Sequence, residues 1–381
     1  MDGNFPVSPD ARQRVRDDGV SQTFREAVNG FLADALTDAL RQAGRETVGL
    51  KSPRWASKLW QEKLHARGWA APSWPVEHGG TGWSAAEQLY FETACADQDA
   101  PIVYSSGIRT IGPLIMAMGR EDQKQAYLPA ILTGAHEWCQ GYSEPQAGSD
   151  LTALQLRAER DGDDFVLNGS KIWTSLTNDA THMFLLARCD PAASGKDGLV
   201  FLLVEMDRPG IEVRPIRFID GTCETCQVFF TDVRTPASDR IGEIGDGWTA
   251  ARTLMTIARS NNTTPGRLRR ALRAAKHSLG ADGADPALAA RLAALEMRLD
   301  TFEALSARKA SEAQGAVTPL TASMLKVLAT ELQQAINAAA LDGGPGAPLA
   351  LPRYLANRAA TIYSGTSEIH RNTMARLIGC A

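Results

Sequence analysis

Residues 141–150 read GYSEPQAGSD, and the character of the sequence changes at this stretch. Before it, from about residue 20 to residue 133, apolar residues recur every three or four positions, which is the period of an amphipathic helix. After it, up to about residue 239, short runs rich in β-branched and aromatic residues are separated by Gly, Asp and Asn. A helical region therefore gives way at about residue 134, just before this stretch, to a compact antiparallel β-domain.

The two sides of this stretch predict different secondary structure. The predicted helices before it are residues 57–69, 84–98 and 121–134. The first of them ends at Gly68, a residue type that suits a helix C-cap, and a loop rich in Pro and Gly follows at 71–83. The predicted strands after it are residues 165–175, 182–190, 199–207, 211–219 and 226–236.

The pattern becomes helical again after Trp248. One long helical pattern starts there, and Pro265 is expected to kink or break it. Further helices are predicted at 285–314 and 319–341, with two shorter ones after residue 351. The order of helices, strands and helices predicts three domains. They are an N-terminal helical domain at 1–133, a middle β-domain at 134–239 and a C-terminal helical bundle domain at 240–381.

Composition limits the classes of partner. The chain has 381 residues, enough for one large core or two to three packed sub-domains. Its formal net charge of −4 favours neither nucleic acid nor an anionic membrane surface. No apolar run approaches the roughly 20 residues that cross a bilayer. The first 19 residues are polar and lack an apolar signal region, so we expect a cytoplasmic protein.

The six cysteines are scattered, and only Cys223 and Cys226 have CxxC spacing. Such a pair is either a redox pair or half of a zinc site, or it is simply two thiols in a turn before a strand. No second CxxC motif and no pair of histidines lies nearby in the sequence. The sequence therefore favours the structural interpretation and predicts no metal.

Five motifs in a fixed order resemble those of the acyl-CoA dehydrogenase family. They are GYSEPQAGSD at 141–150, NGSKIWTS at 168–175, VFFTDVRTP at 228–236, GDGW at 245–248 and IYSGTSEIHRN at 362–372. The resemblance extends over about residues 20 to 379. It implies an α+β fold with an N-terminal helical domain, a middle antiparallel β-domain and a C-terminal four-helix bundle. It also implies FAD as the cofactor, an acyl-CoA substrate and an electron-transfer flavoprotein as the acceptor.

The resemblance implies a flavin site around the first two motifs. An isoalloxazine ring needs hydrogen-bond partners near N1, O2 and N5 and a flat apolar wall. Tyr142 and Ser143 are expected to bond the ring through backbone and hydroxyl, and Ser149 to face the pyrophosphate and the pantetheine. Trp173 is expected to pack on the ring, although a plain core aromatic is the alternative. Ser175 is expected to bond the N5 edge.

The closing motif predicts the start of a helix. Thr366 or Ser367 can be its N-cap, and Glu368 falls in the first turn, where an acid suits the helix dipole. A helix N-terminus also suits a cofactor phosphate or a thioester oxygen that gains charge, so Thr366 is predicted to contact the cofactor. The backbone N–H of Ser364 is predicted to polarise the substrate thioester.

Both positions at which the family carries its catalytic glutamate lack a carboxylate here. One is Ser364, immediately before Gly-Thr, and the other is Ala258 in an Ala258–Arg259 pair. An unactivated hydroxyl is too weak a base to remove an α-proton. Glu224 and Asp342 are weakly motivated substitutes, so the catalytic residue is unknown. Arg259 is expected to stabilise the bundle, with a contact to CoA as the alternative.

Segments that the family uses to complete a partner's flavin site also differ here. The usual Arg-x-x-Phe-Gly stretch is replaced by KHSLGADGADPA at 276–287, and Ala340 replaces the Gln before Gly343–Gly344. Together with the empty base positions, these departures fit one explanation. The chain resembles a branch of the family that acts on steroid side-chain CoA esters as α₂β₂ heterotetramers. We therefore expect a paralogous subunit as partner.

Three functions stay open at this point. The first is a subunit of an FAD-dependent acyl-CoA dehydrogenase that desaturates a bulky CoA thioester. The second is a flavoenzyme on the same scaffold with different chemistry, such as desulfination or oxidation. The third is a non-catalytic structural partner of an active paralogue.

Overall fold

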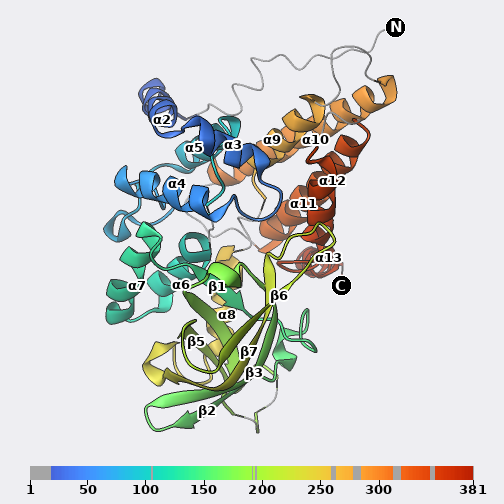
Figure 1. The fold of residues 1–381 in the computed structure, drawn as a ribbon. Helices are drawn as coiled ribbons and strands as arrows, with labels where there is room; N and C mark the ends of the chain where they lie inside the picture. Colours follow the sequence, from blue (N-terminus) through green and yellow to red (C-terminus); the bar gives the residue numbers. More distant parts are fainter. Residues whose placement is uncertain are drawn as a thin grey trace. The chain divides into compact units, whose positions relative to one another are not determined.

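The computed structural model describes residues 19–103, 106–190, 192–193, 195–258, 263–277, 285–311, 319–343 and 348–380 (Figure 1). Contacts divide the chain into two compact units. We call Met1–Val48, Gly82–Ile102 and Ser260–Ala381 the helical unit, and Gly49–Thr81 and Val103–Arg259 the sheet unit. The three domain boundaries expected from the sequence stay a prediction.

The described residues of the sheet unit contain an eight-stranded sheet. Its strands are β1 (Trp138–Gly141), β2 (Arg157–Asp161), β3 (Asp164–Ser175), β4 (His182–Arg188), β5 (Leu199–Glu205), β6 (Ile211–Ile216), β7 (Thr225–Pro236) and β8 (Arg240–Ile241). The order is β6-β7-β3-β2-β4-β5-β8, and β1 pairs with β4. The predicted strands are confirmed within a few residues at their ends.

The expectation of a purely antiparallel sheet needs one correction. Most neighbouring strands are antiparallel, but β1 pairs with β4 in parallel, and so does β2 at a single pair of residues. Parallel neighbours need a long connection, and the β2–β3 hairpin supplies it between β1 and β4. The short run WCQG that forms β1 was not predicted as a strand.

Helices cover one face of this sheet. They are α6 (Gly112–Met118), α7 (Glu121–Thr133) and α8 (Gly247–Ala258), together with the π-helix η2 (Ser106–Ile111), while α4 (Arg54–Ala66) packs on α7. Gly68 lies just past α4 with a φ of +77°, as the prediction of a helix end there requires. The α8 helix begins within the GDGW motif and packs on β5.

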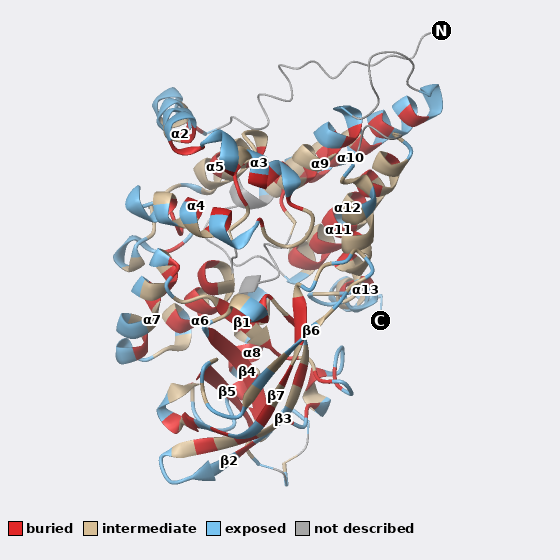
Figure 2. Ribbon diagram, viewed as in Figure 1, coloured by how far each residue is buried: buried red, intermediate tan, exposed pale blue. Residues whose placement is uncertain are grey.

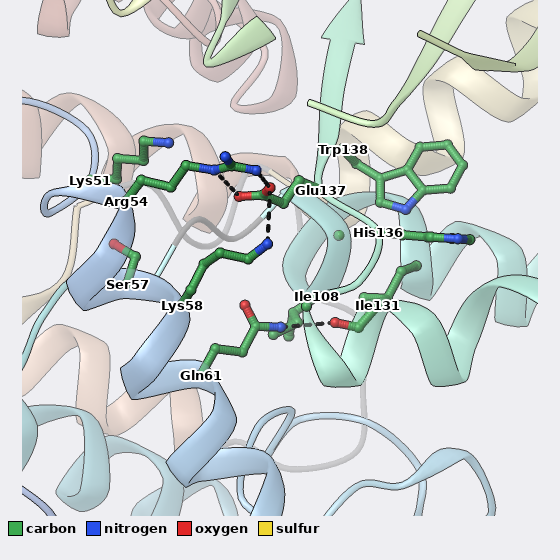
Figure 3. A pocket seen from close by; sticks show the side chains of 12 residues that line it. Lys51, Arg54, Ser57, Lys58, Gln61, Ile108, Ile131, His136, Glu137 and Trp138 are labelled. Atoms are coloured by element: carbon green, nitrogen blue, oxygen red, sulfur yellow. Dashed lines mark hydrogen bonds and ion pairs between the residues drawn. The ribbon is translucent and has the colours of Figure 1, made fainter. Parts of the chain in front are cut away.

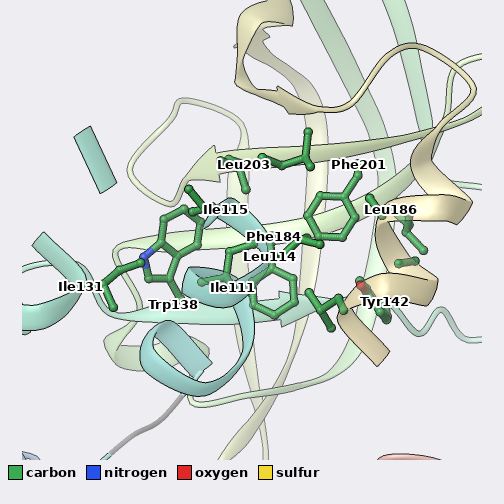
Figure 4. Packing of buried hydrophobic residues seen from close by; sticks show 14 of the residues in the cluster. Ile111, Leu114, Ile115, Ile131, Trp138, Tyr142, Phe184, Leu186, Phe201 and Leu203 are labelled. Atoms are coloured by element: carbon green, nitrogen blue, oxygen red, sulfur yellow. The ribbon is translucent and has the colours of Figure 1, made fainter. Parts of the chain in front are cut away.

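The two central strands, β4 and β5, are buried on both faces, which suits their continuous apolar runs (Figure 2). In β4, Phe184 and Leu186 belong to a cluster that includes residues of η2, α6 and α8 (Figure 4). Met183 and Leu185 belong instead to a second cluster, which also contains residues of β3 and β7. The sheet therefore curls so that its β3–β7 half packs on its β4–β5 half.

The helical unit combines helices from both ends of the chain. They are α2 (Gln22–Ala35), α3 (Asp38–Glu46), α5 (Ala85–Asp97), α9 (Pro265–His277), α10 (Pro286–Ser311), α11 (Pro319–Leu341), α12 (Ala350–Ala356), the 3₁₀ helix η6 (Asn357–Thr361) and α13 (Ser367–Leu377). Pro265 begins α9, so it breaks the long helical pattern, as predicted. Helices α9, α10 and α11 pack together, and α5 packs on α9 and α10.

Two further predictions concern membranes and cysteines. No helix within the described ranges is long and apolar enough to cross a membrane. All six cysteines are free thiols. Cys223 is exposed in the turn before β7, whereas Cys226 is buried in β7 and its thiol contacts the side-chain oxygen of Asn178 at 3.2 Å.

A group of stacked rings in the sheet unit gives stability that depends on pH. The His136 and His182 rings lie 4.0 Å apart, and Trp138 lies 4.8 Å from His182. His182 is 8% exposed. Burial, followed by the neighbouring His136, lowers the pKa of His182 to about 4. Since the unfolded chain holds this proton up to about pH 6.5, unfolding takes up a proton between these values.

We expect the sheet unit to lose stability as the pH falls from about 6.5 to about 4. The loss from His182 is on the order of 3 kcal/mol, because its pKa falls from 6.5 to about 4 and a full pKa unit corresponds to about 1.4 kcal/mol. In His182→Phe, which keeps a stacking ring, denaturant melts in this range should depend less on pH. The control His65→Phe, at an exposed position on α4, should behave as wild type. An unchanged slope in His182→Phe would contradict the assignment.

Candidate active site

A buried ion pair holds the loop at 142–150 against β3. The Lys171 Nζ lies 2.7 Å from the Glu144 carboxylate, and their side chains are 0% and 2% exposed. The same Nζ donates to the carbonyl oxygen of Tyr142 at 3.2 Å. The Glu144 carboxylate also accepts from the backbone N–H groups of Gln155 and Leu156, at 2.6 and 2.9 Å. Burial lowers the pKa of Lys171 to about 8, against the attraction of Glu144.

This network places Tyr142 and Ser143 beside the end of β3. The Ser143 carbonyl accepts from the Ile172 N–H at 2.9 Å. The Tyr142 ring points into the core and lies 6.0 Å from Phe184 and 6.3 Å from Phe201 (Figure 4). Burial raises the pKa of the Tyr142 hydroxyl, which has no hydrogen-bond partner among the described residues. Tyr142 can therefore contact a ligand at this loop only through its backbone. Ser143 is half-buried, so its side chain is also accessible to a ligand.

Trp173 occupies a strained and exposed position on β3. Two residues between Lys171 and Thr174 face one residue of β7, so β3 has a β-bulge there. Trp173 has a φ of +59°, and its side chain is 57% exposed. A left-handed conformation costs a residue with a side chain roughly 1–2 kcal/mol. The bulge turns the indole outward, 6.4 Å from the ring of Phe218, so Trp173 is not a plain core aromatic.

The remaining predicted residues of the sheet unit lie near these. Ser175 is the last residue of β3 and is half-buried, while Ser149 is exposed at the end of the 142–150 loop. Next to Ser175, Leu176 also has a left-handed φ, of +60°. Backbone strain of this kind concentrates at functional sites. The sheet unit thus brings together five predicted residues on one loop and the end of one strand.

The helical unit carries the other two predicted residues, Ser364 and Thr366. Thr366 is the N-cap of α13, because its hydroxyl accepts from the Ile369 N–H at 3.2 Å. The alternative N-cap, Ser367, is buried within the first turn. Glu368 is exposed in that turn, as a capping acid is expected to be. Ser364 is exposed and has a φ of +56°.

The positions considered for the base either lack a carboxylate or have one that is bound within the chain. Ala258 ends α8, and Arg259 lies outside the described residues. The Glu224 carboxylate accepts from the Leu50 N–H at 3.0 and 3.1 Å. Burial raises the pKa of Glu224 and this bond opposes the change. Asp342 pairs with Arg291 at 2.7 Å. Glu224 and Asp342 therefore have structural partners.

A small cavity in the sheet unit lies apart from the predicted residues. It is lined by side chains of α4, including Arg54 and Lys58, and by Lys51 and Trp138 (Figure 3). Arg54 and Lys58 both pair with Glu137, and Lys51 pairs with Asp179. Because these charges are neutralised within the chain, we assign the cavity no ligand.

Sequence reasoning missed the residues that hold the predicted site residues in place within each unit. Glu144 and Lys171 lie inside quoted motifs, but only their burial shows that they pair. Lys326 on α11 is 6% exposed and donates to the Gly365 carbonyl at 2.8 Å. Burial lowers its pKa to about 8. The sequence shows Lys326 only as a single lysine among the apolar residues of a predicted helix. A lysine in such a pattern is ordinarily assigned to the exposed face of the helix.

Comparison with known proteins assigns each part of the chain to one family. Models of the acyl-CoA dehydrogenase family match the N-terminal domain over residues 20–135, the middle domain over 139–233 and the C-terminal domain over 245–379. Acyl-CoA dehydrogenase IpdE1 of Mycobacterium tuberculosis is 36% identical over 383 residues, covering 94% of this chain and 97% of that protein. Acyl-CoA dehydrogenase FadE26 of the same organism is 33% identical, covering 92% and 94%.

Solved structures agree with this assignment. The steroid acyl-CoA dehydrogenase Tcur3481-Tcur3483 matches with a TM-score of 0.80 at 28% identity, over 98% of each chain. The ChsE4-ChsE5 complex from Mycobacterium tuberculosis matches with a TM-score of 0.79 at 28% identity, also over 98% of each chain. The order of the motifs, the fold and these relatives agree, and the chain belongs to the acyl-CoA dehydrogenase family.

Proposed function

We propose that this chain is a subunit of an FAD-dependent acyl-CoA dehydrogenase that desaturates a CoA thioester between its α and β carbons. Membership of the family supports the oxidoreductase chemistry. The single observation that carries the flavin assignment is Trp173, a strained tryptophan whose indole is 57% exposed beside a polar loop. A folded chain keeps such a residue in place only if its surroundings impose it.

The residues present fit an isoalloxazine ring. The exposed indole of Trp173 provides a flat apolar wall. The half-buried hydroxyls of Ser143 and Ser175 and the backbone at Tyr142 provide polar groups for its edge. In the proposal Ser149 contacts the pyrophosphate and Thr366 contacts the cofactor at the start of α13. FAD, when bound, accepts the β-hydrogen of the substrate as a hydride.

The chain's own residues prepare the substrate but do not deprotonate it. The backbone N–H of Ser364 is proposed to donate to the thioester oxygen, which makes the α-proton more acidic. A base normally contributes a further 10²–10⁴-fold, roughly. Neither Ser364 nor Ala258 can supply it, so we propose that the base comes from another chain.

A paralogous subunit is therefore part of the proposal, in an α₂β₂ assembly. Two of the similar structures are named as pairs of chains, Tcur3481-Tcur3483 and ChsE4-ChsE5. Large apolar side chains are also exposed on the C-terminal elements. They are Leu328, Leu351, Ile362, Ile369, Leu377 and Ile378. We propose that some of these side chains contact the partner, because large exposed apolar patches mark protein–protein interfaces.

The names of the relatives suggest the class of substrate. One similar structure is described as a steroid acyl-CoA dehydrogenase, so we propose a bulky, ring-containing acyl group. An electron-transfer flavoprotein is the proposed acceptor, and a cytoplasmic location stays a prediction. The missing base also favours a second candidate, a non-catalytic partner of an active paralogue. Desulfination or oxidation, which needs no α-proton base, is the third.

The flavin assignment predicts a specific loss in Trp173→Ala. We expect the affinity of the purified chain for FAD to fall about tenfold or more, because a stacked aromatic ring is removed. The free energy of unfolding should change little in Trp173→Ala, since the side chain is mostly exposed. Trp173→Phe should retain most of the affinity. The measurement is quenching of flavin fluorescence during titration of FAD with the apoprotein.

Trp55→Ala is the matched control. Trp55 lies on α4 of the same unit and is 54% exposed, close to the exposure of Trp173. Its replacement should leave FAD affinity as in wild type. If Trp173→Ala also binds FAD as wild type does, the flavin does not stack on this indole and the proposed site is wrong.

A further inference from the structure

Two buried side chains hold the loop before α13 from the inside of the helical unit. The Lys326 Nζ donates to the carbonyl oxygen of Gly365 at 2.8 Å, and Lys326 is 6% exposed. The His370 Nε2 lies 3.1 Å from the carbonyl oxygen of Ser364, and His370 is 1% exposed. Because a carbonyl oxygen can only accept, the Nε2 of His370 carries the proton and donates.

These contacts fix which way the neighbouring N–H groups point. The peptide bonds are trans and planar, so the C=O and N–H of one peptide point in opposite directions. With the carbonyls of Ser364 and Gly365 turned inward, the N–H groups of Gly365 and Thr366 are turned outward. The described residues offer neither of these N–H groups an acceptor. The φ values of +56° at Ser364 and +87° at Gly365 define the conformation that is held.

Lys326 makes an unusual contact for a buried cation. No ion pair of Lys326 occurs among the described residues of the chain, and its Nζ is directed at a backbone carbonyl instead. Burial of an unpaired charge is unfavourable unless hydrogen bonds compensate it. A cation on the Gly365 carbonyl also polarises that peptide, which makes the Thr366 N–H a stronger donor. The arrangement is therefore suited to an acceptor that carries or gains negative charge.

We infer that Lys326 and His370 are positioning residues for the proposed dehydrogenation. They hold the carbonyls of Ser364 and Gly365 inward, so that the N–H groups of Gly365 and Thr366 face outward and, beside the Ser364 N–H proposed above, donate to the oxygen of the bound acyl thioester. Neither side chain touches the substrate in this account, and both act through the backbone. The inference rests on the proposed function, because only a thioester gives these N–H groups the expected acceptor.

The test compares ligands with and without the carbonyl oxygen. CoA thioesters of octanoic, cyclohexylacetic and cholanic acid are paired with the thioethers in which CH₂ replaces C=O. Binding to the FAD-loaded chain, co-purified with its partner, is measured by calorimetry. In Lys326→Met we expect thioester affinity to fall about tenfold, while thioether affinity stays constant. Lys326→Arg, which keeps a charged donor, should recover most of the loss.

Thr330→Val is the control for loss of a buried hydrogen bond on the same helix. The Thr330 hydroxyl donates to the Lys326 carbonyl at 2.9 Å and to the Val327 carbonyl at 3.3 Å, both within α11. Thr330→Val should lower the free energy of unfolding without changing the ratio of thioester to thioether affinity. If Lys326→Met does not fold, Lys326→Gln gives the same comparison with a smaller loss, about threefold, because it keeps a neutral donor.

The possible results distinguish a failure of the positioning role from a failure of the proposed function. Equal weakening of both ligands in Lys326→Met, or no weakening, overturns the inference and leaves the proposed function standing. Failure of the wild-type assembly to hold FAD, or to bind any of the thioesters, contradicts the proposed function and with it the inference. A selective loss of thioester affinity, restored by Arg, supports both.

Discussion

Replacing Ser364 with Glu should let the isolated chain reduce its flavin with acyl-CoA about 10²–10⁴ times faster than the wild-type chain. We expect the wild-type chain alone to react slowly, because Ser364 stands where the family's carboxylate would be. Ser364 is exposed and already has a left-handed φ of +56°. A glutamate adds no new backbone strain there, so the variant should fold as wild type does.

The matched control for this change is Ser364→Gln, which has nearly the same shape and cannot accept the proton. Both variants are mixed anaerobically with the CoA thioesters named above, and the loss of the visible flavin band is followed in time. A Glu variant no faster than the Gln variant would show that position 364 does not face the α-carbon. That result would support the alternative functions, namely desulfination, oxidation or a non-catalytic role beside an active paralogue.

Breaking the buried ion pair should produce the largest loss of stability in the chain. In Lys171→Met the Glu144 carboxylate stays 2% exposed without its cation. Removing one partner of a buried pair typically costs about 3–5 kcal/mol. Chemical denaturation, followed by the fluorescence of buried tryptophans of the sheet unit, measures this change. FAD affinity should fall as well, because the pair fixes the loop that carries Tyr142 and Ser143.

A double-mutant cycle and an exposed pair serve as controls. Lys171→Met with Glu144→Gln should lose less than the sum of the two single changes, because the uncompensated charge is gone. Arg234 of β7 contacts Asp161 and Asp164 on the surface of the same unit. Arg234→Met should change stability little. Additive losses at Lys171 and Glu144 would contradict the proposed coupling.

The sequence predicted those elements whose cause is local. The apolar runs of β4 and β5 identified them as strands, and the structure shows that both are buried on both faces. Pro265 identified the break before α9, since proline is accepted at the first turn of a helix but not in its interior. The polar turn and hydroxyl residues at 366–367 identified the start of α13, and the order of the motifs identified the family.

Features that depend on distant contacts did not follow from the sequence. The parallel pairing of β1 joins residues about 44 positions apart, and α5 packs with helices of the C-terminal half. The left-handed φ of Trp173 results from a register shift against β7. The bond from Lys326 to Gly365 spans 39 positions. In each case the local sequence does not indicate which distant residue the side chain or strand will contact.

The central claim is that this chain holds the flavin and binds the thioester, while a second chain supplies the base. The most direct measurement is an anaerobic titration of FAD-bearing protein with ring-containing CoA thioesters, first for this chain alone and then with a co-expressed, glutamate-bearing paralogue. We expect bound FAD whose visible band bleaches only when both chains are present. Rapid bleaching of the chain alone would contradict it, because the base would then lie within this sequence.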